Sequence, residues 1–117
     1  MKTEVMYNQL TNWGADVSKA RELLLEDDEL YVSCLIKFAD DENFALLDCC
    51  MEKGDLKGAF DHAHAIKGVA GNLGLTPLFN AASQLVEPLR NGAAQSLGCK
   101  LEEVMRLKDE FTQIVGE

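Results

Sequence analysis

The sequence lacks any apolar run approaching the roughly 18 residues that a membrane-spanning helix needs, and its opening residues, Met1–Val5, contain no apolar signal core. Positive charge is also scarce, since 11 lysines and arginines stand against 20 aspartates and glutamates, for a net charge of −9. Nucleic-acid backbones require patches of lysine and arginine, so this balance argues against a nucleic-acid partner. We therefore expect a cytoplasmic protein that binds neither membranes nor nucleic acids.

Metal-binding and nucleotide-binding patterns are missing as well. The four cysteines lack metal-finger spacing, and without a signal peptide a disulfide framework is not expected. The sequence has no glycine-rich nucleotide loop and no obvious carboxylate cluster for Mg²⁺ beside its histidines. It therefore predicts neither an ATP site nor a metal site, and no cofactor of the chain's own.

The sequence does contain helical periodicity, with no credible strand, internal repeat or linker. Its 117 residues suffice for one domain with a single core. The expected helices span residues 3–13, 17–25, 29–39, 42–53, 56–73, 77–91 and 96–115. The short turns between them favour an all-α fold, an antiparallel up-down four-helix bundle over residues 28–117. Short helical segments within residues 1–27 should cap this bundle, so that residues 1–117 form a single domain.

Particular residues predict where some of these helices begin and end. Asp16 is an expected N-cap, and Thr76 should cap a helix that has Pro77 in its first turn. Gly54 and Gly74 should end the helices that precede them, with positive φ at Gly74.

The helix expected over residues 56–73 carries two stripes of side chains. One stripe is apolar, repeats at three- and four-residue steps, and is explained as core. Its members are Leu56, Ala59, Ala63, Ile66, Ala70 and Leu73. The other stripe falls within roughly 100° of arc on the helix, and core packing does not explain it. Its members are Lys57, Phe60, His64, Lys67, Gly68 and Gly71.

The glycines of the second stripe indicate a functional surface. A glycine inside a helix costs about 1 kcal/mol relative to alanine, so selection for stability alone would not place Gly68 and Gly71 there. Both remove side chains from the surface beside His64, and Lys67 lies within reach of whatever the imidazole carries. This combination predicts a site for a transferable anionic group, and a phosphoryl group fits it best. His62 lies about 160° around the helix from His64, so it cannot share this site.

The same residues resemble the motif of histidine-containing phosphotransfer (HPt) domains. Ala63–Gly68 reads Ala-His-Ala-Ile-Lys-Gly, and Gly71–Gly74 reads Gly-Asn-Leu-Gly. The family pattern is a histidine, any residue, an aliphatic and Lys-Gly, with Asn-Leu-Gly a few residues on. The resemblance covers the whole chain in length and helix layout. Gly71 is a mild departure, because the family generally has another small residue at that position.

The resemblance implies a four-helix bundle with His64 exposed midway along one helix, and a phosphocarrier rather than an enzyme. Family members pass phosphoryl groups between aspartates of response-regulator receiver domains in multistep two-component phosphorelays. His64 would then be the phosphoacceptor, Lys67 would support the phosphoryl group electrostatically, and the partner would supply Mg²⁺. Expected partners are receiver domains and a hybrid histidine kinase, with a monomer as the default state. The expected docking surface comprises Phe60, Lys57, Gly68 and Gly71.

Three alternatives remain open from the sequence. The histidine domain of a sensor kinase would have an acidic residue after the histidine and a proline soon afterwards, whereas Ala65 follows His64 and the first proline is Pro77. A helical module could bind a partner protein without being phosphorylated. A metal or cofactor bundle would need repeated Glu and Glu-x-x-His ligands, which are missing. We expect a free-standing protein rather than a piece of a larger kinase.

Overall fold

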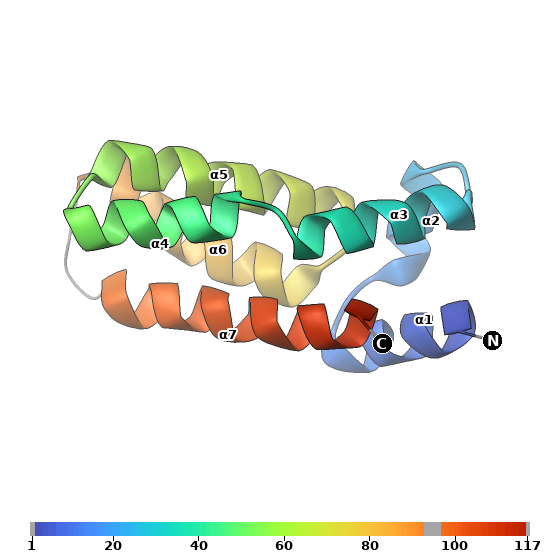
Figure 1. Ribbon diagram of the computed structural model, residues 1–117. Coiled ribbons are helices and arrows are strands. Elements are labelled where there is room, and N and C mark those ends of the chain that lie inside the picture. The colour runs from blue at the N-terminus through green and yellow to red at the C-terminus, as the bar shows by residue number, and fades with distance from the viewer. Residues whose placement is uncertain (1, 93–96, 117) are drawn as a thin grey trace.

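The chain folds into helices, as its periodicity predicts (Figure 1). The computed structural model describes residues 2–92 and 97–116, and no strand occurs within these ranges. The helices are α1 (Lys2–Trp13), α2 (Val17–Leu23), α3 (Asp28–Ala39), α4 (Asn43–Lys53), α5 (Leu56–Asn72), α6 (Thr76–Arg90) and α7 (Leu97–Gly116). These bounds agree closely with the expected ones, and residue 96, the expected start of the last helix, lies outside the described residues.

The four-helix bundle is built from α5, α6, α7 and the consecutive pair α3 and α4 (Figure 1). α3 and α4 follow each other end to end and together take the place of one helix of the bundle. α5 packs against both α4 and α6, α6 also packs against α7, and α3 closes the bundle against α7. Short turns join α4 to α5 and α5 to α6, so these neighbours run antiparallel. The predicted all-α four-helix bundle is confirmed.

Side-chain caps determine where several helices begin. The carboxylates of Asp16, Asp27 and Asp55 each accept a hydrogen bond from the backbone N–H three residues further on. The three bonds measure 3.0–3.1 Å and lie at the starts of α2, α3 and α5. Each satisfies one of the amides that the first turn of a helix leaves without a partner. Gly54 ends α4 in the left-handed conformation (φ +74°), as predicted.

The turn between α5 and α6 packs directly against the N-terminal segment. Gly74 has the expected positive φ (+71°), and its carbonyl accepts hydrogen bonds from the N–H groups of Asp16 (2.7 Å) and Thr76 (3.0 Å). A Cβ at Gly74 would collide with the Asp16 carbonyl, so this close approach requires glycine. The prediction that Thr76 caps α6 is wrong, because Leu75 occupies the N-cap and makes no side-chain bond. The N–H of Thr76 donates to the Gly74 carbonyl, and Thr76 is the first residue of α6.

Aromatic side chains attach the N-terminal segments to the bundle. Trp13 of α1 stacks on Phe111 of α7 with ring centroids 6.0 Å apart, and its indole N–H donates to Glu110 at 2.9 Å. Tyr31 of α3 is fully buried, and its hydroxyl donates to the Leu73 carbonyl just after α5 at 2.8 Å. The Trp13 contacts therefore join α1 to α7, and the Tyr31 bond joins α3 to the end of α5.

A small charged network joins α1, α2 and α3. The Asp28 carboxylate accepts hydrogen bonds from the Tyr7 hydroxyl (2.7 Å) and the Arg21 guanidinium (2.8 Å). These two bonds hold the pKa of Asp28 below its usual value. Burial, together with the bond to Asp28, raises the pKa of Tyr7 to about 12.

Candidate functional site

α5 has one buried face and one face toward solvent. Ala59, Ala63, Ile66 and Ala70 are buried in the core, in agreement with the apolar stripe of the sequence. His64 is exposed, midway along the helix. An imidazole in this position sits on a rigid element and can be reached by a second protein.

The two glycines beside His64 have different surroundings. A Cβ added at Gly68 would meet no atom within 4 Å, so the surface there is open as expected. A Cβ at Gly71 would lie 3.1 Å from the Phe79 ring of α6. The structure therefore differs from the expectation of a cleared surface at Gly71, because the space left by the missing side chain seats an aromatic ring from the neighbouring helix. The expectation failed because α6 packs closely against α5 at Gly71, and the periodicity of α5 alone does not reveal this packing.

Lys67 lies on the side of Gly71 and is half-buried. Its ammonium is 5.8 Å from the centre of the Phe79 ring, which is within range of a cation–π contact. Among the described residues Lys67 forms no salt bridge to a carboxylate. The Lys67 ammonium therefore lies against an aromatic ring one turn from His64, and no carboxylate of residues 2–92 and 97–116 neutralises it.

Phe60 lies one turn before His64 on the same face. The two rings stack with centroids 5.7 Å apart and planes inclined by 25°. The Arg90 guanidinium of α6 also lies over the Phe60 ring, 5.5 Å from the ring centre. Phe60 is half-buried, as expected for a residue at the edge of the core.

Lys57 is exposed near the start of α5, away from His64. It lines a shallow cavity of about 320 Å³ where α5 meets the end of α6. The cavity is formed by Leu56, Lys57, Phe60, Leu89, Arg90 and Gly92. The structure therefore groups Lys57 with Phe60 and Arg90 rather than with the imidazole.

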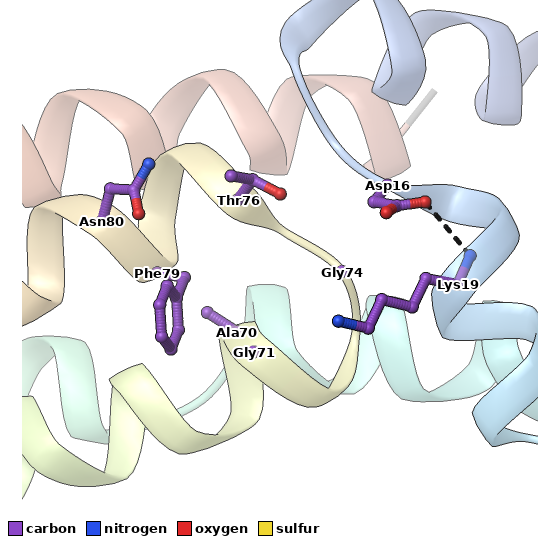
Figure 2. A pocket seen from close by; sticks show the side chains of 8 residues that line it. All are labelled: Asp16, Lys19, Ala70, Gly71, Gly74, Thr76, Phe79 and Asn80. Atoms are coloured by element: carbon purple, nitrogen blue, oxygen red, sulfur yellow. Dashed lines mark hydrogen bonds between the residues drawn. The ribbon is translucent and has the colours of Figure 1, made fainter.

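A second cavity lies where α2 approaches the α5–α6 turn (Figure 2). It has a volume of about 430 Å³ and is lined by Asp16, Lys19, Ala70, Gly71, Gly74, Thr76, Phe79 and Asn80. The Lys19 side chain extends toward the Gly74 turn (Figure 2). Because Gly71 and Phe79 belong to this cavity and also flank Lys67, the cavity continues the surface that begins at His64.

His62 occupies a different environment from His64. It is half-buried, and its Nδ1–H donates to the Asn43 side-chain carbonyl at the start of α4, at 2.8 Å. The Asn43 amide in turn donates to the Asp41 carboxylate at 2.9 Å, which orients the carbonyl oxygen toward His62. His62 therefore joins α4 to α5 and is spatially separate from the His64 face, as its position on the helix predicts.

Sequence reasoning missed three residues of this surface, Phe79, Arg90 and Lys19. Phe79 lies within the helix expected over residues 77–91, for which no part in the site was predicted. Its contact with Lys67 and that of Arg90 with Phe60 depend on the register between α5 and α6. The place of Lys19 depends on how α2 meets the turn. No motif or spacing within a single helix predicts the contacts of Phe79 and Arg90 or the position of Lys19.

Over residues 2–92 and 97–116, no group of three or more His, Cys, Asp or Glu residues is arranged to hold a metal ion. None of the helices in these ranges has both the length and the apolar character needed to cross a membrane.

The exposed His64 ring, the half-buried Lys67 and the open surface at Gly68 all lie on α5. The sequence profile of the Hpt domain family matches residues 12–117, and the chain belongs to this family. Hpt domains take part in histidine phosphotransfer within phosphorelays, where they interact with receiver domains. Comparisons with curated proteins and with solved structures gave no match.

Proposed function

We propose that this chain is a histidine phosphotransfer protein of a multistep two-component phosphorelay. His64 would accept a phosphoryl group from the aspartate of one receiver domain and pass it to the aspartate of another. The observation that carries the proposal is the exposed His64 ring beside the open surface at Gly68. A receiver domain can approach this ring without meeting a side chain at the next turn of the helix.

The chemistry needs one neutral imidazole. A ring nitrogen attacks the phosphorus of the aspartyl phosphate with its lone pair, and an N–P bond forms as the P–O bond to the aspartate breaks. The carboxylate leaves with the bonding electron pair. Transfer to the second receiver reverses these steps, with the second aspartate as nucleophile. Orientation of the two proteins supplies most of the rate acceleration, since each step becomes effectively intramolecular in the complex.

Lys67 would stabilise the phosphoryl group on His64. Opposite charges about 4 Å apart attract each other by roughly 1 kcal/mol in water and roughly 4 kcal/mol near a protein surface. The Lys67 ammonium lies on an aromatic ring and has no carboxylate partner among the described residues, so it is available for an incoming anion.

The docking surface proposed for the receiver domain follows α5. It includes Gly68, Phe60 and Lys57, together with Gly71, whose neighbouring space is filled by the Phe79 ring. The receiver domain would contribute Mg²⁺ and its own acidic pocket, so the chain itself would need no ATP or metal site. We further propose a free-standing cytoplasmic monomer that serves a hybrid histidine kinase.

The proposal is tested by incubating the protein with a phosphorylated receiver domain and Mg²⁺, and by measuring acid-labile, base-stable phosphate on the chain. His64→Gln should abolish labelling. His62→Gln is the matched control and should label like the parent, because His62 points toward α4. Labelling of both variants at the parental level would overturn the assignment. Lys67→Ala should slow transfer while the helical content stays unchanged.

A further inference from the structure

Three flat groups from two helices lie against one another at the surface. The Arg90 guanidinium of α6 rests over the Phe60 ring at 5.5 Å, and the Phe60 ring stacks on the His64 imidazole at 5.7 Å. Glu87 lies one turn before Arg90 and approaches its guanidinium at 3.6 Å. The exposed imidazole is therefore in contact with a side chain that is itself held from a second helix.

The arrangement follows from helix geometry. Side chains on a helix lean toward its N-terminus, so a residue at position i covers the residue at position i−4. His64 consequently lies back over Phe60 rather than over Gly68. The Phe60 side chain is restricted to its rotamer, because it is half-buried against the core and the Arg90 guanidinium lies over its ring.

We infer that Phe60 is a positioning residue for the His64 imidazole, an inference that rests on the function proposed above. An exposed side chain without contacts samples several staggered rotamers, and only some of them aim a ring nitrogen at the partner. Stacking engages the face of the ring, whereas the nitrogen lone pair lies in the ring plane and stays free to attack phosphorus. An aromatic pair of this kind enriches the stacked rotamer by about two- to tenfold.

The test compares the parent with Phe60→Leu and Phe60→Tyr. Leucine keeps an apolar side chain at the core edge but removes the aromatic face, whereas tyrosine keeps the face. Two measurements are made on each protein: the NMR shifts and χ1 couplings of the His64 ring, and the rate of phosphorylation over a range of phosphorylated-receiver concentrations. Circular dichroism checks that each variant is folded.

We expect Phe60→Leu to shift the His64 ring protons toward the values of an unstacked histidine and to average its χ1 couplings. The maximal phosphorylation rate should fall by about two- to tenfold, and the half-saturating receiver concentration should change less, because leucine keeps an apolar side chain in the docking surface. Phe60→Tyr should restore both the shifts and the rate.

Other outcomes would overturn the inference. Unchanged ring shifts in Phe60→Leu would mean that the stack does not orient the imidazole. A change confined to the half-saturating concentration would identify Phe60 as a docking contact only, and a Phe60→Tyr rate as low as that of Phe60→Leu would exclude a role for the aromatic face. Failure of the phosphotransfer function itself is recognised separately, because the parent would then take up no label or His64→Gln would be labelled like the parent, while the NMR comparison would still report on the stacked ring.

Discussion

Replacing Gly68 by alanine is expected to stabilise the folded protein and to slow phosphotransfer. Alanine in a helix interior is more stable than glycine by about 0.5–1 kcal/mol. Within this chain no steric penalty offsets the gain, because the added Cβ would meet no atom within 4 Å. For a domain of 117 residues, such a gain raises the Tm by about 2–4 °C.

The effect on transfer has the opposite sign because a partner must occupy the open space. If a receiver domain packs closely over Gly68, a methyl group there introduces an overpacked contact, which typically costs 1–3 kcal/mol. The transfer rate should then fall by about five- to hundredfold, since each 1.4 kcal/mol corresponds to a factor of ten.

Rapid-quench measurement of phosphoryl transfer from a labelled receiver domain, combined with thermal melts, checks both halves of the prediction. Gly98→Ala in α7 is the matched control, because Gly98 is also exposed and its added Cβ would also meet no atom. This variant should transfer at the parental rate. If Gly68→Ala is more stable than the parent yet transfers equally fast, the glycine gap is not a contact surface and the reasoning fails.

Further predictions concern packing and pH. Gly71→Ala should lower the Tm relative to Gly68→Ala, because its Cβ would press on the Phe79 ring at 3.1 Å, and thermal melts of both variants test this. Tyr31→Phe leaves a buried carbonyl at the end of α5 without its donor and should destabilise the fold by about 1–3 kcal/mol in urea titrations. The pKa of Asp28 is lowered by folding from its ordinary 3.8, so its stabilisation is complete above about pH 4 and is lost as the pH falls through the lower folded value. The stability difference between the parent and Asp28→Asn should therefore shrink on acidification, whereas a constant difference would contradict this assignment.

Much of the fold could be predicted from the sequence because its helices are marked locally. The expected helix over residues 56–73 corresponds to Leu56–Asn72, and Asp16 and Gly74 act as their residue types suggest. Thr76 shows where this approach fails. A Thr-Pro pair usually starts a helix at the proline, but here the Gly74 carbonyl accepts hydrogen bonds from the N–H groups of Thr76 and of Asp16, and the helix already begins at Thr76.

The candidate site could be predicted only along α5. The exposure of His64 and the open surface at Gly68 follow from positions on a single helix, which the sequence specifies directly. Part of their surroundings comes from α6, where the Phe79 ring faces Gly71 and the Arg90 guanidinium faces Phe60. Such relations between helices depend on how the core fills, and that information is spread over the whole chain.

The hydrogen bond from His62 to Asn43 makes the two histidines chemically unequal, although a single residue separates them. An acylating reagent such as diethyl pyrocarbonate attacks an unprotonated imidazole nitrogen that solvent can reach. Both neutral rings keep one unprotonated nitrogen, but the His62 side chain is half-buried and packs against Asn43, whereas the His64 ring faces the solvent. Limited treatment should therefore carbethoxylate His64 first. The proposed phosphoacceptor of the native protein could then be blocked and later regenerated with hydroxylamine, without any change to the gene.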